Sequence, residues 1–574
     1  MGGGEGVLGS GVTRGKVDEA EWQPPPIPCE RSRGQKLVID IKETLIFFFG
    51  VPSKFLVLVD TSIITFSQIL TIKNLIYCLS LSMFVCTAII AMGIKSDNVI
   101  YNTRSCQRCF SDYPPENPVS RAFRLLGNDF KKAAGKLTNK EPNLENYEHD
   151  NTDLDKFPTH TDVVIIGGGV MGSSIAYWLK EMSAGALDVA VIEKDPTYCE
   201  SSTVLSVGGI RQQFSLPENI EMSQYGAEFF RTIKKRLGID IQFTPRGYLL
   251  LANENSISIL EENFKTQKKY NVKNEMLSKE KIKEKFPWLN LDDIVGGCLG
   301  LENEGWFDPW SLLAGFKQKA VRLGANYVEA EASGFEFEEN RNIIVPGVEG
   351  TLKRARTLYV TTKDGRVRPI NFSICVIAAG AQSGKVAQMA NIGIGEGLLS
   401  IQLPVEPRKR YVYCFNSQDP NIPGLNTPMV IDPSGTYFRR EGLGTSFIAG
   451  RCPLPENEPH IDNLEVDHDF FHTDVWPQLG FRVPAFEGVK VTGSWAGYYD
   501  YNTYDENGII GTHPYHGNLY FATGFSGHGI QQAPAVGLAL AELIILGAYH
   551  TIDLTRLGFD RFIMKLPMYE TNIY

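Results

Sequence analysis

The pattern of apolar and polar positions divides the chain into three parts. Residues 1–40 are rich in Gly and Pro and carry both signs of charge, which is typical of a disordered segment. Residues 41–94 are strongly apolar, and 74–94 contain no charged side chain, so this stretch is just long enough to cross a hydrocarbon core of about 30 Å. From Asp162 onward, short β-branched runs alternate with helical stretches, which indicates an α/β fold.

The apolar leader has two interpretations, and both stay open. It is either a membrane anchor near the N-terminus or a segment outside the working protein, with translation starting at Met92 or processing beyond it. From Met92 the sequence is rich in Arg and Ser like a transit peptide, although Asp97 and Glu116 break the acid-poor pattern. Residues 119–137 fit a basic amphipathic helix on a membrane surface, but we favour a solvated helix before a linker at 140–160.

Composition narrows the classes of partner and site. The net charge of −10 excludes nucleic acid as an expected partner, because phosphate contacts need a basic face. The 10 cysteines follow no regular spacing, which indicates a reducing compartment. Cys106 and Cys109 form a lone CxxC without a second ligand pair, so we predict ordinary thiols and no metal site. Cys375 and Cys414 lie in apolar runs and are predicted to be small core residues.

A Gly-rich motif opens the α/β region. Residues 162–166 are predicted to form a buried parallel strand, and Gly167, Gly169 and Gly172 follow at once as a GxGxxG motif before a helix over 173–180. The first glycine allows a tight turn, the second lets the backbone approach a pyrophosphate, and the third lets the helix pack on the strand. The free N–H groups at the helix start then face the phosphates.

A second strand supports a dinucleotide site. Residues 189–192 are a short β-branched run that ends in Glu193, an acid about 20 residues past the glycines, where a ribose hydroxyl finds its partner. Because no basic residue replaces this acid, a 2′-phosphate is disfavoured. This unit alone leaves both FAD and NAD open.

The C-terminal part narrows the choice of cofactor. Residues 518–522 are predicted to be a strand that enters a second Gly-rich turn at 523–529 and then a helix over 530–546. The start of such a helix stabilises negative charge on a reduced flavin ring. Residues 373–380 form another strand ending in small residues. One sheet therefore takes strands from both ends of the chain, and the middle must supply a second domain.

Together these segments resemble the D-amino acid oxidase superfamily, which includes sarcosine oxidase, dimethylglycine dehydrogenase and glycine oxidase. The resemblance covers about 162–560 and lies in VVIIGGGVMGSSIAYWL, VIEKD, SSTVLSVGGI, VIAAGAQS and YFATGFSGHGIQQAPAVG. It implies an α/β fold with a Rossmann-like FAD-binding domain and a second, sheet-containing substrate domain. The expected ranges are 1–150 for the leader and linker, 160–240, 315–400 and 485–560 for the FAD-binding domain, and 241–314 and 401–484 for the substrate domain.

A narrower resemblance is to mitochondrial flavoproteins that assist assembly of respiratory complex I. It lies in SVGGIRQQFSLPENI, EGWFDPWSLL, LPVEPRKRYVY, LEVDHDFF and WAGYYDYNTYDENG. It implies a location on the matrix side of the mitochondrial inner membrane, with complex I subunits or assembly intermediates as partners. The first 91 residues or so fall outside this resemblance.

The superfamily resemblance also implies which residues hold FAD. The expected cofactor-binding residues are Gly167, Gly169, Val170, Met171, Gly172, Glu193 and Lys194 at the ADP part, Ser201, Ser202 and Gly208 after it, Ala332 at the adenine, and Ala379, Gly380, Gly524, Gly527, His528, Gly529, Ile530 and Gln531 along the ring and ribityl chain. Relatives with covalent FAD use a Cys or a His. Residues 498–505 contain no Cys, and Leu205 stands near the position of the His, so we predict non-covalent FAD.

Candidate catalytic residues are less well defined. Relatives bind a substrate carboxylate through a cation. Here residues 496–499 lack the expected Arg, and Gln531 replaces a Lys. The cations and polar groups left as candidates are Arg211, Arg408, Arg410, Tyr437, Arg439 and His528. For each of these cations taken singly, a surface charge or local ion pair is the favoured alternative.

Strand alternation puts Arg408 and Arg410 on one side and Lys409 and Tyr411 on the other. His528 either contacts the flavin or is a turn histidine satisfied by the backbone. The departures at the carboxylate site favour the complex I assembly role. The alternative is an active FAD-dependent dehydrogenase or oxidase of a small secondary or tertiary amine acid such as sarcosine or dimethylglycine.

Overall fold

The computed structural model describes residues 157–340 and 352–572. The expected disorder over 1–40, the apolar stretch 74–94, the transit-like segment and the CxxC motif all lie outside these residues.

Strands from both ends of the described chain form one seven-stranded sheet, as predicted. β1 pairs in parallel with both β2 and β10, and β10 pairs in parallel with β17. Strand β10 thus lies between β1, the first strand of the described chain, and β17, the last. The central strands are buried on both faces: helices pack on one face, and apolar residues of other strands and of two shorter helices pack on the other. The strands of this first sheet are β1 His160–Ile166, β2 Val189–Glu193, β8 Asn326–Asn340, β9 Leu352–Thr362, β10 Val367–Ile377, β16 Ile509–Thr512 and β17 Leu519–Thr523.

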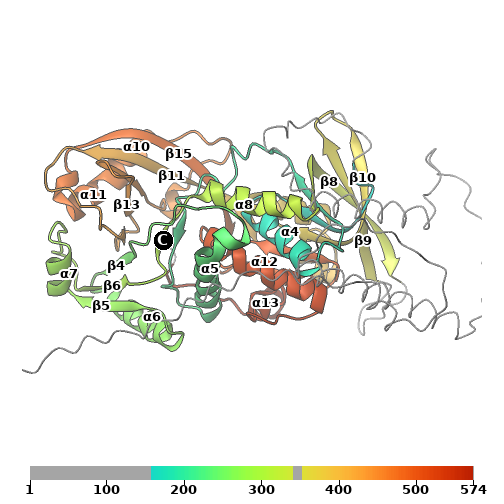
Figure 1. Ribbon diagram of the computed structural model, residues 1–574, viewed down its shortest axis with the longest axis horizontal. Coiled ribbons are helices and arrows are strands. Elements are labelled where there is room, and N and C mark those ends of the chain that lie inside the picture. The colour runs from blue at the N-terminus through green and yellow to red at the C-terminus, as the bar shows by residue number, and fades with distance from the viewer. Residues whose placement is uncertain (1–156, 341–351, 573–574) are drawn as a thin grey trace, which may run out of the picture. The chain divides into compact units, whose positions relative to one another are not determined.

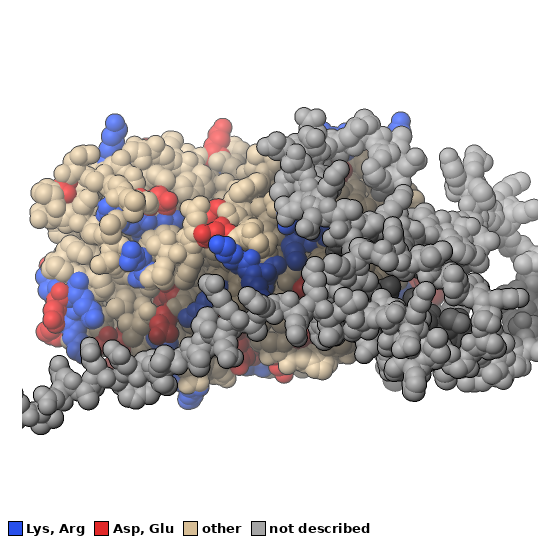
Figure 2. All heavy atoms as spheres, viewed as in Figure 1, with Lys and Arg blue, Asp and Glu red and all other residues tan. Residues whose placement is uncertain are grey.

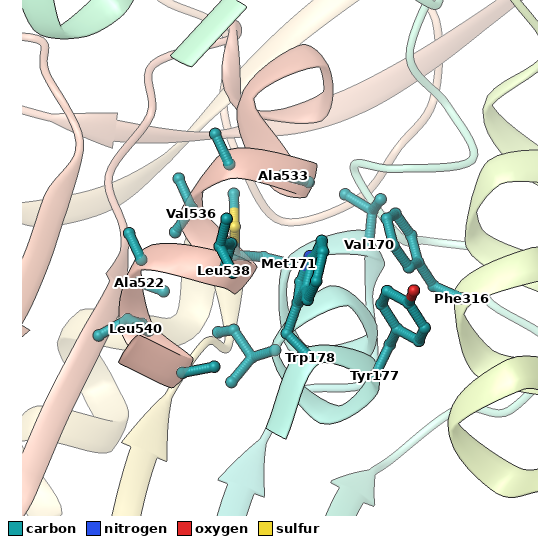
Figure 3. Packing of buried hydrophobic residues seen from close by; sticks show 14 of the residues in the cluster. Val170, Met171, Tyr177, Trp178, Phe316, Ala522, Ala533, Val536, Leu538 and Leu540 are labelled. Carbon is teal, nitrogen blue, oxygen red and sulfur yellow. The ribbon is translucent and has the colours of Figure 1, made fainter. Parts of the chain in front are cut away.

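Helices α4 and α12 pack against each other beside this sheet (Figure 1). The Ser174 hydroxyl donates to the carbonyl of Ala533 at 2.7 Å, and the Trp178 indole donates to the carbonyl of Pro534 at 3.0 Å. Figure 3 shows apolar side chains around this contact: the Trp178 ring lies 5.0 Å from that of Tyr177, which in turn lies 5.7 Å from the ring of Phe316. The helices of this layer are α4 Val170–Met182, α5 Pro217–Arg236, α8 Pro309–Arg322 and α12 Gly529–Leu546.

Helix α12 is apolar nearly all round. Within the described part of the chain it is the one helix whose length and hydropathy would suit a membrane span, and 67% of that stretch is buried in the protein. A helix that is buried on most sides needs an apolar surface on most sides, so its composition follows from its place in the core.

A second, eight-stranded sheet lies beside the first (Figure 1). Its longest ladder joins β11 to β15, from Val405 opposite Asn502 to Ser417 opposite Val489. We had expected 485–560 to lie in the FAD-binding domain, but β15 pairs in the second sheet, so only the part after this strand returns to the first. The strands in spatial order are β15 Val489–Asn502, β11 Val405–Ser417, β14 Ser446–Gly450, β13 Tyr437–Glu441, β12 Met429–Ile431, β4 Tyr248–Ala252, β6 Gly296–Gly300 and β5 Asn274–Ser278.

Shorter elements complete the described fold. A two-stranded ribbon joins the loop after β2 to the segment before α8. The remaining strands and α-helices of the described residues are β3 Gly209–Ile210, β7 Gly305–Trp306, α6 Ile257–Lys269, α7 Lys279–Lys285, α9 Ser383–Met389, α10 His468–Phe470, α11 Trp476–Arg482 and α13 Asp560–Met564. On the face drawn in Figure 2, acidic and basic side chains lie among one another.

Candidate cofactor and substrate site

One cavity of about 520 Å³ runs from the Gly-rich turn of the first sheet to strands β11, β13 and β15 of the second. Its walls come from segments far apart in sequence, because the two sheets meet here. Most of the predicted cofactor residues line it: Gly167, Gly169, Val170, Met171, Glu193, Lys194, Ser201, Ser202, Ala332, Ala379, Gly380, Gly527, Gly529 and Ile530.

The three motif glycines have the geometry expected of a dinucleotide turn. Gly167 has a φ of +103°, and a Cβ there would lie 2.3 Å from the carbonyl oxygen of Ala378. A Cβ on Gly172 would lie 1.9 Å from the carbonyl oxygen of Gly167, so only glycine lets α4 start this close to β1. Gly169 faces the cavity, and its nearest side-chain neighbour is the Thr203 hydroxyl.

Two helices begin at this cavity without a side-chain cap. The N-cap residue of α4 is Gly169 and that of α12 is His528, and neither gives a side-chain hydrogen bond to its helix. Neither first turn carries an acid. The N–H group of Val170 does donate to the Thr203 hydroxyl at 3.1 Å. Uncapped helix starts attract an anion, so the residues present fit the pyrophosphate and an electron-rich flavin ring.

The ribose end of the cavity centres on Glu193. Its carboxylate accepts the N–H groups of Gly168 at 2.8 Å and Asp195 at 2.9 Å, which fixes its direction. Burial raises the pKa of this carboxyl. Beside it lies the Tyr198 hydroxyl, which is buried and has no hydrogen-bond partner within the described structure. An orphaned buried hydroxyl is costly unless a ligand pairs with it, so this wall fits a polar group such as a ribose.

At the other end of the cavity, the second sheet contributes Arg410, Tyr437, Tyr499 and Asp500. Arg410 donates from both terminal nitrogens to the carboxylate of Glu458, at 2.8 and 2.9 Å. This two-pronged pair uses the same nitrogens that would bind a substrate carboxylate. Arg410 therefore reaches the cavity as predicted, but as half of an ion pair.

Asp500 at this end of the cavity has no such partner. Its carboxylate accepts the N–H group of Phe525 at 3.1 Å, and its carbonyl oxygen accepts the N–H of Ser526 at 3.2 Å. Among the described residues no basic side chain forms an ion pair with it. Burial raises the pKa of its carboxyl to about 6.

Arg211 and His528, which we named as candidate catalytic residues beside a structural alternative for each, are not among the residues that line the cavity. The Arg211 guanidinium donates to the carbonyl of Gln213 at 2.7 Å and lies 4.1 Å from the centre of the Phe214 ring. His528 packs on the same ring, and burial together with the nearby Arg211 charge lowers its pKa to about 3. Neutral and buried, His528 packs on Phe214, and its Nε2 atom has no hydrogen-bond partner within the described structure.

Arg408 and Arg439 also lie outside the cavity lining. Arg408 pairs with Glu406 at 2.6 Å and shares Glu458 with Arg410, which confirms the predicted side of the strand. Arg439 pairs with Glu441 and donates to the carbonyl of Val207 at 3.1 Å. Arg408 and Arg439 therefore form local ion pairs, which is the alternative that the sequence analysis favoured over a role in substrate binding.

Four other predicted residues support the site from behind. Gln531 accepts the N–H group of Arg211 through its side chain at 2.8 Å. A Cβ on Gly208 would lie 2.1 Å from the carbonyl oxygen of Phe307, and Gly524 has a φ of +75°. Gly172 is the fourth of these residues, and the three glycines shape the turns that carry the lining residues.

Sequence reasoning missed Tyr198, Thr203, Tyr499 and Asp500. The first two follow Glu193 in the loop that the resemblance already placed at the cofactor, so their position was a usable signal. Tyr499 and Asp500 lie within residues 496–505, where relatives carry a Cys or an Arg at the active site. Polar side chains at these positions were therefore a signal that the sequence already contained. The described residues along the cavity wall include no Cys and no His, and non-covalent FAD stays a prediction.

A Gly-rich βαβ turn, an acid at the second strand and a cavity closed by a second sheet define a dinucleotide-binding oxidoreductase. A family model described as FAD dependent oxidoreductase matches residues 162–543, and the chain belongs to this family. FAD is the cofactor of this family, and the residues that line the cavity fit it; when bound, FAD supplies an acceptor for a hydride.

The chain is similar to FAD-dependent oxidoreductase domain-containing protein 1 of Xenopus laevis, with 52% identity over 427 residues, covering 72% of this chain and 85% of that protein. It is 23% identical over 435 residues to monomeric sarcosine oxidase of a Bacillus strain, covering 72% and 100%. The solved structure of L-proline dehydrogenase from P. horikoshii superposes with a TM-score of 0.60 at 26% identity, covering 72% of this chain and 100% of that one.

Proposed function

We propose that this flavoprotein assists the assembly of respiratory complex I on the matrix side of the mitochondrial inner membrane. Its partners there are complex I subunits or assembly intermediates. The proposal rests on the resemblance in segments such as SVGGIRQQFSLPENI and WAGYYDYNTYDENG. In this proposal the FAD serves the structure of the protein or its interaction with partners.

One observation supports this role over simple amino-acid oxidation. Of the predicted cations, Arg410 lines the cavity, and both of its terminal nitrogens donate to Glu458. An amino-acid oxidase needs a cation at this place to hold the substrate carboxylate. A protein whose cation is already neutralised is poorly built for that substrate, while its cofactor site is intact.

A complementation experiment tests the assembly role. In cells without this protein, we expect fully assembled complex I to fall on native gels and to recover when the full chain is restored. Gly169→Glu, which removes the cofactor, separates a need for FAD from a need for the protein alone. Unchanged levels of complex I after loss of the protein would contradict the role.

The second candidate is an active FAD-dependent dehydrogenase or oxidase acting on the CH–NH group of a small secondary or tertiary amine. It is favoured by Asp500, a carboxylate on the cavity wall that is able to orient an amine nitrogen and to take its proton. An amine in its neutral form keeps a lone pair, which helps hydride leave the neighbouring carbon. Sarcosine and dimethylglycine are the examples of such amines that the sequence analysis named.

The anaerobic visible spectrum of the purified flavoprotein tests this candidate. Addition of sarcosine, dimethylglycine or a simple amine should bleach the flavin absorption if one of them is a substrate. A spectrum that bleaches with dithionite and with none of the amines would leave the assembly role as the function of the cofactor.

A further inference from the structure

We propose that the second-sheet end of the cavity binds the cationic nitrogen of an amine that carries no carboxylate, with Asp500 as its acceptor. The inference rests on the second candidate function above and names its substrate class. It departs from sarcosine and dimethylglycine, which both carry a carboxylate.

The first support is the charge balance of the strands that form this wall. Among the described residues of β11, β13 and β15 that line the cavity, the charged side chains are Arg410 and Asp500. The Glu458 carboxylate holds Arg410 through both terminal nitrogens, so the pair contributes about zero net charge. Asp500 is then the unbalanced charge, and this wall is negative. A negative wall attracts a cation and repels a carboxylate.

The second support is how Asp500 is held. The N–H group of Phe525 donates to its Oδ2 atom, and the ladder to β11 fixes its backbone opposite Pro407. These contacts aim the carboxylate without neutralising it, because backbone N–H groups carry no net charge. An ionised carboxylate that is partly removed from water without a cation is costly, and a bound ammonium would offset that cost.

The other basic residues on the cavity wall do not belong to this sheet. Lys194 follows β2 and Lys385 lies on α9. Neither forms an ion pair with Asp500 in the described structure. Tyr437 and Tyr499 also line this wall, and the Arg410 guanidinium lies over the ring of Tyr499, 5.6 Å from its centre.

A pair of ligands with the same branched group and opposite charges tests the inference. tert-Butylammonium and pivalate share the tert-butyl group, and the quaternary carbon of that group has no hydrogen, so neither ligand is oxidised there. Each is titrated into the full-length protein with FAD bound, and binding is followed by the change in the flavin spectrum or by calorimetry. We expect tert-butylammonium to bind at least about tenfold more tightly than pivalate.

Two variants invert the result in a predictable way. Asp500→Asn keeps an acceptor for the Phe525 N–H group and removes the charge, so tert-butylammonium should bind about tenfold more weakly. Glu458→Gln removes the negative charge beside Arg410 and leaves one of its two terminal nitrogens without its acceptor, so pivalate should bind about tenfold more tightly. If Asp500→Asn loses FAD or misfolds, the comparison of the two ligands on the wild type and on the Glu458 variant still tests the inference.

Equal binding of the two ligands to the wild type, or tighter binding of pivalate, would overturn the inference. So would an Asp500→Asn variant that binds the ammonium unchanged. Oxidation is measured separately with N-methylisopropylamine and sarcosine, which have the hydrogen that tert-butylammonium lacks. Ammonium binding without bleaching by N-methylisopropylamine would uphold the site and contradict the dehydrogenase function.

Discussion

The two ends of the cavity hold charge by different means. The dinucleotide end offers backbone N–H groups at the uncapped starts of α4 and α12, and its main acid, Glu193, is oriented by backbone donors. The second-sheet end offers side chains, of which Arg410 is paired within the protein. Backbone donors are placed by the turn and carry no net charge for a neighbouring residue to neutralise, whereas the charge of Arg410 is neutralised by Glu458. The cofactor end is therefore fixed by the fold, and the substrate end is set by a few replaceable charges.

The largest effect should come from placing a charge at the dinucleotide end. Gly169→Glu puts a carboxylate at the start of α4, where it occupies the pyrophosphate position and takes the same N–H groups. We expect FAD binding to be abolished, with a loss of at least about 100-fold in affinity. The flavin-to-protein ratio after purification measures this.

Gly488→Glu is the matched control, because a Cβ at this exposed glycine meets nothing within 4 Å. It should keep its flavin. If the Gly169→Glu protein is still yellow after purification, the backbone N–H groups at the start of α4 do not bind the cofactor.

A buried carboxyl near the second sheet should make stability depend on pH. Glu304 accepts the N–H group of Gln212 at 2.8 Å and the amide of Gln213 at 2.9 Å, and burial raises its pKa to about 7. Because the folded pKa lies above the ordinary value, the folded state holds the proton more tightly. The stabilisation is full below about pH 4.5 and is lost as the pH rises through about 7, by up to about 3 kcal/mol.

Glu304→Gln should flatten this loss, because a neutral amide keeps an acceptor for the backbone and has no charge to bury. Urea unfolding of the apoprotein at pH 5 and at pH 8 measures the difference. An equal decline in both proteins would mean that Glu304 is ionised in the fold without penalty.

The contact between the second Gly-rich turn and β15 gives a smaller effect. Gly527 has a φ of +97°, and a Cβ there would lie 2.4 Å from the ring of Tyr499. Gly527→Ala should lower the free energy of unfolding by about 2 kcal/mol and weaken FAD binding, since both the backbone and the ring must shift.

Gly435→Ala separates the two causes. Its φ is +82°, but a Cβ there meets nothing within 4 Å, so it reports the cost of the backbone conformation alone. Thermal unfolding of both variants gives the comparison. If they are equally destabilised, the Tyr499 ring does not hold the turn.

The smallest expected effect concerns the ribose wall. The Tyr198 hydroxyl is buried beside Gly168 without a partner, and desolvation raises its pKa, so it stays a neutral donor. Tyr198→Phe should weaken FAD binding by about three- to tenfold and leave the apoprotein as stable or slightly more stable. Fluorescence titration of apoprotein with FAD measures the affinity.

Tyr327→Phe is the matched control, because its hydroxyl already donates to Ser173 at 3.0 Å. It should lose stability in the apoprotein and keep most of its affinity for FAD. The reverse pattern in the two variants would refute a role for Tyr198 at the cofactor.

The sequence by itself determined the dinucleotide end. Gly167, Gly169, Gly172 and Glu193 follow one another in a strand, turn, helix and strand whose geometry is set by nearby residues. Steric limits at a glycine and the N–H groups of a helix start act over a few residues, so their pattern is visible in the chain. The pairing of strands from both ends in one sheet was predicted for the same reason, since each carries its own motif.

Only the tertiary structure decided the substrate end. Arg410 and Glu458 are 48 residues apart, and no local rule joins them. The sequence also placed β15 with the wrong sheet and brought Arg211 and His528 to the cavity, because it cannot show which side of a turn a side chain takes. Long-range strand pairing fixes these positions, and with them whether a charge is free or neutralised. The residues at the cofactor end are thus encoded by short sequence motifs, while the charges at the substrate end depend on contacts between distant strands.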